Sequence, residues 1–303
     1  MSEGAISFRK QMAFEYGVAE TVRPLVRRVV ARNPSAFTFH GTNSFIVGRG
    51  RVAVIDPGPL LDEHLDALTA ALAGETVTHI LVSHTHLDHS PAAQPLRERV
   101  GGAIHGALPR PIPAGERPAE SIQYDFAPDE LLADGTVIAG DGWTLEAVHT
   151  PGHMSNHMCF ALREENVLFT GDHVMGWNTT IVSPPDGNMR EYMASLDRCL
   201  ARPESVYLPA QGPEIPDPAP FTCAYRSHRR MREGEIMRCL NDGVRTIPEM
   251  VKRMEPGGDG HEPQANDTSR WYLVATPEEF RRGQSEAMPW HDKYYALAWT
   301  TPD

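Results

Sequence analysis

The chain alternates short apolar, β-branched segments with turns, and this pattern predicts a fold built on β-strands. Residues 42–48 and 51–55 are two such segments joined by a tight turn, which predicts a β-hairpin. Residues 156–161 and 167–170 predict a second hairpin in the same way. Residues 77–82 form a nearly continuous apolar run, as expected for a strand that is covered on both faces.

Strands are also predicted at residues 143–148 and 205–209, and other segments have the apolar spacing of amphipathic helices. The segments with helical spacing are residues 62–73, 188–201, 221–240 and 246–254. Apolar side chains of the 188–201 helix are expected to pack in the core. His64 is expected to face solvent, as are four arginines of the 221–240 helix: Arg226, Arg229, Arg230 and Arg232.

These elements divide the chain into a main domain of residues 37–240, preceded by an N-terminal arm of residues 1–36 and followed by a small C-terminal module of residues 241–303. The arm carries only a weak amphipathic pattern around residues 22–30, where the arginines are expected to form a solvated face. A length of 303 residues is enough for one large core with a smaller appended module.

Composition narrows the classes of partner and compartment. The formal charge of −12 argues against a nucleic-acid footprint over the whole molecule and against general attraction to anionic membranes. No apolar run approaches the roughly 18 residues of a membrane-spanning helix, and the first residues lack the basic-then-apolar order of a secretory signal. The four cysteines include no Cys-x-x-Cys pair, so reduced thiols are expected. We therefore expect a cytoplasmic protein.

The candidate chemistry begins with the stretch His84-Thr85-His86-Leu87-Asp88-His89, which directly follows the predicted buried strand 77–82. Proteins with α/β folds tend to place their sites at the carboxyl end of such a strand. The four side chains of this stretch that bind divalent metals are His84, His86, Asp88 and His89. A turn followed by a helix that begins near Pro91 lets them face two adjacent metal positions.

Two further potential ligands stand at the ends of predicted strands. His153 follows the 143–148 strand in Thr150-Pro151-Gly152-His153, and Asp172 follows the second hairpin. His149 and His157 flank the His153 loop, and we expect them to orient this loop rather than to bind metal.

These motifs resemble the metallo-β-lactamase superfamily over roughly residues 37–240. The motifs are His-x-His-x-Asp-His at 84–89, Thr-Pro-Gly-His at 150–153 and Gly-Asp at 171–172. The resemblance implies an α/β (α+β) fold, a four-layer αββα sandwich with a metal site at one edge of its two sheets.

Within the superfamily, the chain is most similar to LACTB2-like bacterial hydrolases and to hydroxyacylglutathione hydrolases. This similarity is carried by residues 171–177, 183–189 and 225–230, and by the absence of a cysteine beside Asp172. Residues 246–254 resemble the opening of the small helical, winged-helix-like tail of LACTB2-like proteins.

The resemblance also implies the ligands and the cofactor. Those for the first ion are His84, His86 and His153, those for the second are Asp88 and His89, and Asp172 bridges the two. Zinc is the expected cofactor, as one or two ions per chain, with iron or manganese as alternatives. A metal-bound hydroxide is a nucleophile at neutral pH, and Asp88 is a candidate catalytic group that orients it.

One position departs from the family pattern. Where the family has Gly-His-Gly, whose histidine completes the second metal site, this chain has Ala210-Gln211-Gly212. A glutamine oxygen is a poor substitute for imidazole toward Zn²⁺. Gln211 binds the ion weakly, or a histidine such as His228 or His173 replaces it, or the second ion is lost. A weakened second site is the favoured interpretation.

Three remaining residues have competing interpretations. His228 is a candidate catalytic group for proton transfer on the substrate side, and equally a surface histidine in a basic stretch. His173 and Gln211 are candidate substrate-binding residues.

The resulting functional hypothesis is a metal-dependent hydrolase that acts on a small ester, thioester or lactone. An endoribonuclease is the second hypothesis, and it would need a basic channel that the overall acidity disfavours. The third is a mononuclear iron oxidoreductase similar to persulfide dioxygenases, with His84, His153 and Asp172 as ligands. The expected partner is a small molecule. RNA is less favoured, no membrane partner is expected, and a homo-oligomer is considered.

Overall fold

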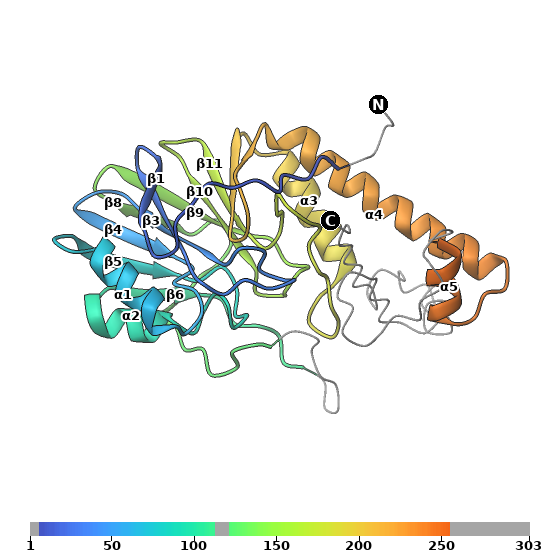
Figure 1. Ribbon diagram of the computed structural model, residues 1–303, viewed down its shortest axis with the longest axis horizontal. Coiled ribbons are helices and arrows are strands. Elements are labelled where there is room, and N and C mark those ends of the chain that lie inside the picture. Colours follow the sequence, from blue (N-terminus) through green and yellow to red (C-terminus); the bar gives the residue numbers. More distant parts are fainter. Residues whose placement is uncertain (1–5, 113–120, 255–303) are drawn as a thin grey trace.

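The computed structural model describes residues 6–112 and 121–254, which form two β-sheets and five helices (Figure 1). The first sheet consists, in order, of β1 (Glu20–Arg23), β2 (Val26–Val30), β3 (Asn43–Val47), β4 (Arg51–Ile55), β5 (Thr76–Leu81), β6 (Ala103–Gly106) and β7 (Glu130–Leu131). The second consists, in order, of β13 (Ile215–Pro216), β12 (Val206–Pro209), β11 (Val167–Gly171), β10 (Met158–Leu162), β9 (Trp143–His149) and β8 (Val137–Gly140). The helices are α1 (Asp62–Ala71), α2 (Ala93–Val100), α3 (Met189–Leu200), α4 (Pro218–Asn241) and α5 (Ile247–Met254).

The apolar core lies in three layers between and outside the sheets. Side chains of both sheets, among them Phe45 and Phe160, are buried where the sheets face each other. Leu65 of α1 and Leu96 of α2 are buried against the first sheet. Helices α3 and α4 cover the second sheet through residues such as Leu196. This order of helix, sheet, sheet and helix layers confirms the predicted αββα sandwich.

The predicted hairpins and the buried strand are present. β3 pairs with β4, and β10 pairs with β11, each in antiparallel register. β5 lies parallel to both β4 and β6, so its carboxyl end opens at the same edge of the sheet as those of its neighbours. Likewise, β11 lies parallel to β12 in the second sheet. The loops after β4, β5 and β6 therefore share one edge of the first sheet, and those after β11 and β12 share one edge of the second.

The N-terminal segment is part of the first sheet and not only an arm outside it. β2 pairs with β3 along its full length, and β1 pairs with β2. Arg28 is 9% exposed and its Nη2 lies 2.8 Å from Glu20 Oε2, while Arg27 pairs with Glu75. The prediction of a solvated arginine face was therefore wrong here, because each guanidinium meets a carboxylate from another element.

Two other predictions of exposure were also wrong. His64 is 2% exposed, and its Nε2 lies 2.8 Å from Ser44 Oγ on β3. Burial lowers the pKa of His64 to about 4, so the ring is neutral near pH 7. Of the four α4 arginines predicted to face solvent, Arg229 and Arg232 are only 4% and 6% exposed, because α4 packs on α3, whereas Arg230 is exposed as predicted.

The C-terminal module is described only as far as Met254. The predicted 246–254 helix is α5, which follows α4 at the far end from the sheets (Figure 1). The remainder of the predicted winged-helix-like module lies outside the described residues. Within residues 6–112 and 121–254, no helix combines the length and apolarity needed to cross a membrane.

Candidate metal centre

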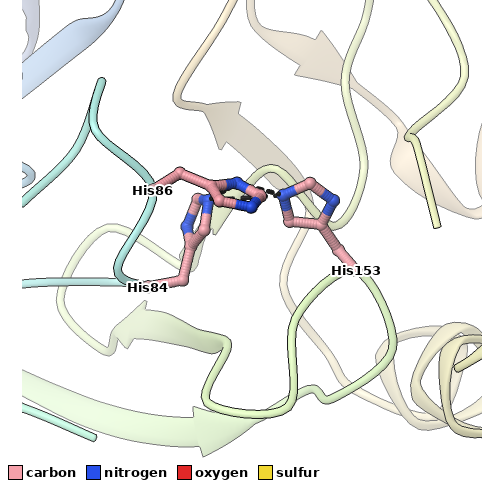
Figure 2. A group of neighbouring side chains, drawn as sticks. All are labelled: His84, His86 and His153. Carbon is pink, nitrogen blue, oxygen red and sulfur yellow. Dashed lines mark hydrogen bonds between the residues drawn. The ribbon is translucent and has the colours of Figure 1, made fainter. Parts of the chain in front are cut away.

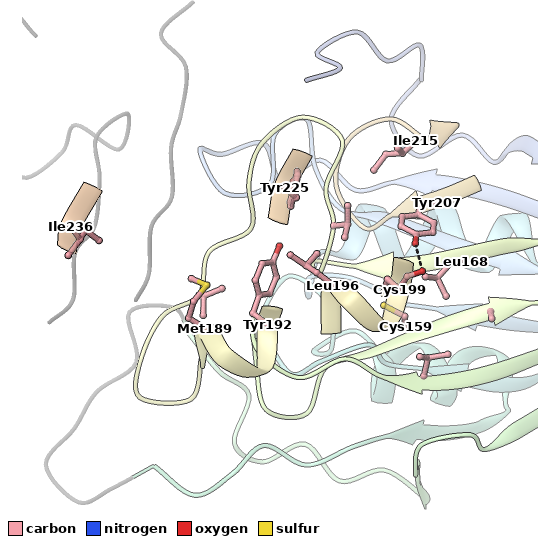
Figure 3. Close-up of a cluster of buried hydrophobic side chains, with 14 of the residues drawn as sticks. Cys159, Leu168, Met189, Tyr192, Leu196, Cys199, Tyr207, Ile215, Tyr225 and Ile236 are labelled. Atoms are coloured by element: carbon pink, nitrogen blue, oxygen red, sulfur yellow. Dashed lines mark hydrogen bonds between the residues drawn. The ribbon is translucent and has the colours of Figure 1, made fainter. Parts of the chain in front are cut away.

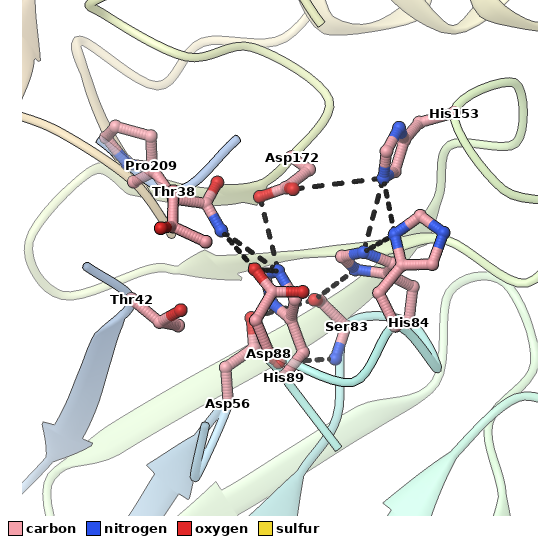
Figure 4. A network of polar contacts seen from close by, with 12 residues as sticks. Thr38, Thr42, Asp56, Ser83, His84, Asp88, His89, His153, Asp172 and Pro209 are labelled. Atoms are coloured by element: carbon pink, nitrogen blue, oxygen red, sulfur yellow. Dashed lines mark hydrogen bonds and ion pairs between the residues drawn. The ribbon is translucent and has the colours of Figure 1, made fainter. Parts of the chain in front are cut away.

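Loops from both sheets meet at one edge of the sandwich (Figure 4). His84 follows β5, His153 lies in the loop after β9, and Asp172 comes directly after β11. Gln211 follows β12 and forms an isolated bridge with Thr42, which leads into β3. Ligands that are distant in the sequence are thus brought together because each one follows a strand that ends at this edge.

Three histidine nitrogens face one another at the centre of this edge (Figure 2). His86 Nδ1 lies 3.0 Å from both His84 Nε2 and His153 Nε2, and the last two atoms are 3.3 Å apart. All three side chains are buried.

Hydrogen bonds on the far side of two rings set which nitrogen carries the proton. Ser83 Oγ donates to Asp56 Oδ2 at 2.8 Å, so it accepts from His84 Nδ1 at 3.0 Å. His153 Nδ1 donates to the carbonyl oxygen of Ile181 at 2.6 Å. A neutral imidazole carries one N–H, so both Nε2 atoms present lone pairs to the cluster.

This donor set fits a divalent metal. Burial, reinforced by neighbouring histidines, lowers the pKa of His84 and the pKa of His86 well below their ordinary values. The rings of His84 and His86 are therefore neutral, which is the form that binds metal. Their separations of 3.0–3.3 Å are close to the distance of about 3.3 Å between ligands of a tetrahedral zinc site.

The second half of the predicted site lies beside the first. His89 Nε2 lies 3.2 Å from Asp88 Oδ2 and 3.5 Å from Asp172 Oδ1. The other oxygen of Asp172 lies 3.8 Å from His153 Nε2, so this carboxylate lies between the two halves, as a bridging role requires. Gln211 Nε2 lies 3.0 Å from His89 Nε2 and 3.1 Å from Asp88 Oδ2.

Charges in this second half are strongly coupled. Burial opposes a positive charge on His89, but the carboxylates of Asp88, Asp172 and Asp56 outweigh it and raise the pKa of His89 well above its ordinary value. Burial also opposes the charge of Asp88, but the interaction with His89 holds the pKa of Asp88 well below its usual range. Metal ligands bind in their deprotonated form, so an ion at this position would release the His89 proton.

Asp56 is a residue of the site that sequence reasoning missed. Its carboxylate accepts hydrogen bonds from the backbone N–H of Ser83 at 2.7 Å and from His89 Nδ1 at 3.0 Å. Asp56 is 2% exposed and has a φ of 48°, a left-handed conformation that is uncommon outside glycine. The sequence signal that could have identified Asp56 is its position directly after β4, the strand that pairs with β5.

His149 and His157 have the orienting role that was predicted for them. His149 Nε2 donates to the carbonyl oxygen of Ser155 at 2.9 Å, within the loop that carries His153. His157 Nδ1 lies 2.9 Å from Thr150 Oγ1 in the same loop, and its Nε2 accepts from the backbone N–H of Asp172 at 3.1 Å, a contact that was not predicted. Both rings therefore hold the backbone of ligand loops.

A cavity of about 390 Å³ opens from the surface onto this cluster. Its lining includes four residues of the candidate centre: His86, Asp88, His153 and Asp172. The other described lining residues are apolar or carry hydroxyl groups: Ser35, Phe37, Thr38, Leu87, Ser121, Met175 and Ile181. Phe37 and Leu87 are 43% and 45% exposed, so they lie toward the mouth of the cavity. Lysine and arginine are absent from this described lining.

Three predicted residues lie away from this cavity surface. His173 and Gln211 are 0% exposed, so neither side chain is accessible for the predicted substrate contact. The His173 ring instead packs edge-on against Tyr192, with centroids 4.9 Å apart. His228 lies on α4, and neither the described cavity lining nor the described groups of potential metal ligands include it. Its catalytic role stays a prediction.

Comparisons with known proteins agree with this geometry. Residues 37–211 match the model of the metallo-beta-lactamase superfamily. An atrochrysone carboxyl ACP thioesterase, AgnL7 of Paecilomyces divaricatus, is 35% identical over 201 residues, which cover 65% of this chain and 59% of that protein. An atrochrysone carboxyl ACP thioesterase of Aspergillus terreus is 31% identical over 254 residues, covering 79% of this chain and 74% of that protein.

A solved structure shares the fold. A metallo-beta-lactamase family protein of Thermus thermophilus, TTHA1429, superposes with a TM-score of 0.63 at 21% identity, covering 78% of this chain and 89% of that one. The two relatives above are fungal proteins, so they support the superfamily but not the narrower LACTB2-like or hydroxyacylglutathione-hydrolase-like assignment. With relatives named as thioesterases and a cluster of metal-binding side chains, the chain is a hydrolase. Its family match and its fold show that it belongs to the metallo-β-lactamase superfamily.

Proposed function

We propose that this hydrolase cleaves acyl thioesters, with an acyl carrier protein as the carrier of the acyl group. The observation that carries the proposal is a cavity that joins the candidate metal ligands to apolar walls formed by Phe37, Met175 and Ile181. Such walls suit an apolar acyl group and leave its carbonyl carbon beside the ligand cluster. The names of two relatives, both ACP thioesterases, point to the same bond.

Within this proposal, the side chains of the centre have distinct tasks. A bound divalent ion supplies Lewis-acid chemistry, which polarises a carbonyl and makes water a nucleophile near pH 7. His84, His86 and His153 would hold it, and Asp172 faces both halves of the centre. Asp88 lines the cavity with a carboxylate that is ionised at neutral pH, so it can orient water or accept its proton.

A substrate panel tests the proposed bond. Metal-loaded protein is expected to hydrolyse a benzoyl thioester of N-acetylcysteamine at least about tenfold faster than the matched benzoyl oxygen ester, because thiolate is the better leaving group. The same acyl group on a carrier protein then tests the carrier. Equal or faster cleavage of the oxygen ester would contradict the thioester proposal.

The endoribonuclease alternative has less support in the cavity. Phosphodiester backbones are bound mainly through lysine and arginine, and the described lining contains neither. Single-stranded RNA belongs in the same panel as a second substrate. Cleavage of RNA without cleavage of the thioester would favour this alternative over our proposal.

We also propose that Gln211 weakens the second metal position. Its side-chain nitrogen lies 3.1 Å from Asp88 Oδ2 and 3.0 Å from His89 Nε2, so the amide stands beside both remaining ligands of that position and donates an N–H to the Asp88 carboxylate instead of offering a lone pair to an ion. The protein is accordingly expected to hold about one ion per chain. Zinc is the proposed metal, and iron with sulfur-dependent oxygen uptake would instead support the oxidoreductase alternative.

Exchanging this glutamine for a ligand tests the weakened site. The variant Gln211→His is expected to raise the metal content from about one to about two ions per chain, because imidazole restores a good zinc ligand. Elemental analysis after dialysis measures the content. Gln94→His adds a histidine on the surface of α2 and is the matched control. An unchanged content in Gln211→His would remove the proposed role of Gln211.

A further inference from the structure

The loop of residues 172–181 connects the metal centre to the cavity. It begins with Asp172, whose two oxygens face His89 and His153. Further along, Met175 and Ile181 line the cavity. The conformation of this one loop therefore affects both the candidate ligands and the walls around the substrate.

Residues Thr180 and Ile181 join two candidate ligands through the backbone. The hydroxyl of Thr180 donates to the carbonyl oxygen of Asp172 at 2.6 Å and also lies 3.0 Å from that of His173. The next carbonyl oxygen, that of Ile181, accepts from His153 Nδ1 at 2.6 Å. A shift at this pair of residues would move the Asp172 backbone and release the His153 ring together.

Three buried side chains from α3 and α4 hold the carbonyl groups of this loop. Tyr192 on α3 donates to the carbonyl oxygen of His173 at 2.8 Å. The hydroxyl of Tyr225 on α4 donates to that of Met175 at 2.6 Å and contacts that of Asn178. Arg229 Nη2, one turn further along α4, donates to the carbonyl oxygen of Thr180.

These donors are protected from competition with water and remain protonated. Tyr192 and Tyr225 are 0% exposed, and Arg229 is 4% exposed. Burial raises the pKa of Tyr192 to about 12 and also raises the pKa of Tyr225 well above its ordinary value. Both phenols are therefore protonated at neutral pH and can donate their hydrogen bonds.

We infer that Tyr192, Tyr225 and Arg229 are positioning residues of the metal centre, acting through the 172–181 loop although none is itself a candidate ligand. Their hydrogen bonds fix the carbonyl groups of the loop, and the loop in turn fixes Asp172 and the His153 ring. Outer hydrogen-bond partners of metal ligands commonly change metal affinity by about 10–100-fold. The inference rests on the proposed metal centre but does not depend on the thioester as substrate.

A matched set of tyrosine variants tests this inference. Tyr225→Phe and Tyr192→Phe each remove one hydroxyl that holds the loop and keep the aromatic ring. Tyr207→Phe is the control, because the Tyr207 hydroxyl is also buried and donates to the carbonyl oxygen of Cys199 at 3.1 Å, away from the loop (Figure 3). The measurement is the zinc dissociation constant, by competition with a chelating dye, together with kcat and KM on the thioester.

The expected result is a dissociation constant about tenfold higher in Tyr225→Phe and Tyr192→Phe than in Tyr207→Phe, at similar losses of thermal stability. KM is also expected to rise in Tyr225→Phe, because Met175 lines the cavity. Equal zinc affinities in all three variants would overturn the inference. So would failure of both loop variants to fold while Tyr207→Phe folds, since the hydroxyls would then serve the fold alone. Zinc affinity is read without substrate, so inactivity toward thioesters leaves this test intact.

Discussion

Replacing His86 with alanine is expected to lower the rate of thioester hydrolysis by at least about 10³-fold, equivalent to about 4 kcal/mol of lost transition-state stabilisation. The reason lies in the geometry of the cluster, where His86 Nδ1 is 3.0 Å from both His84 Nε2 and His153 Nε2. Removing the His86 ring takes away one of the three nitrogens that are expected to bind the ion. Metal content and kcat/KM measured on the same preparation would show the two losses together.

The control for this prediction is His79→Ala. His79 is a partly buried histidine on β5, and its ring contacts Thr78 and His105 away from the candidate ligands. This variant is expected to keep its metal and at least about a third of its activity, because no donor of the centre is lost. A rate within tenfold of the native protein in the His86 variant would contradict the assigned metal centre.

The second large effect is expected at Asp88. Asp88→Asn keeps the size of the side chain and removes its charge, and we expect kcat to fall by about 10²–10³-fold, the range for loss of a general base. The pKa of Asp88 is held well below its ordinary value because the interaction with His89 outweighs the effect of burial. The native group is therefore a carboxylate at neutral pH, which asparagine cannot replace as a proton acceptor.

The metal content of Asp88→Asn shows whether this variant has lost a catalytic group or a metal ligand. The triad of His84, His86 and His153 does not include Asp88, so the ion of that triad is expected to stay bound while kcat falls. Asp141→Asn changes an exposed acid in the turn between β8 and β9, and it applies the same change of net charge as a control. A fall in metal content that accounts for the whole loss of rate would argue for a ligand role alone.

The fold could be predicted from sequence where a local pattern determined the structure. The apolar run that became β5 and the two hairpins were recognised because each has a period and a turn of its own. The strands β1 and β2 were missed, because Arg27 and Arg28 interrupt the apolar pattern. Arg27 pairs with Glu75, and Arg28 pairs with Glu20. Arg27 and Glu75 are far apart in the sequence, so sequence spacing alone does not indicate their pairing.

In the candidate site too, residues within a local motif could be predicted, and residues joined by long-range contacts could not. The motif at residues 84–89 allowed its ligands to be predicted, because four metal-binding side chains within six residues are typical of a metal site. The positions of Asp56 and Tyr225 could not be read from the sequence. Asp56 meets His89 across 33 residues, and Tyr225 meets Met175 across 50 residues. Those contacts exist only once the sheets and α4 have packed.

The same limit explains the predictions for His173 and Gln211. Both stand next to motif residues in the sequence, which suggested contact with substrate. In the fold, the side chain of His173 turns toward Tyr192, and Gln211 is enclosed by Asp88 and His89. Position in the sequence therefore identified the correct region of the molecule, but it did not show in which direction each side chain points.

The most direct test of the central claim is a zinc titration of chelator-stripped protein, with thioester hydrolysis measured at each addition. We expect stripped protein to be inactive and the rate to rise in proportion to zinc over the first equivalent per chain, because His84, His86 and His153 form the tighter site. Full activity in the stripped protein, or a rate that does not respond to added zinc, would contradict a metal-dependent thioester hydrolase.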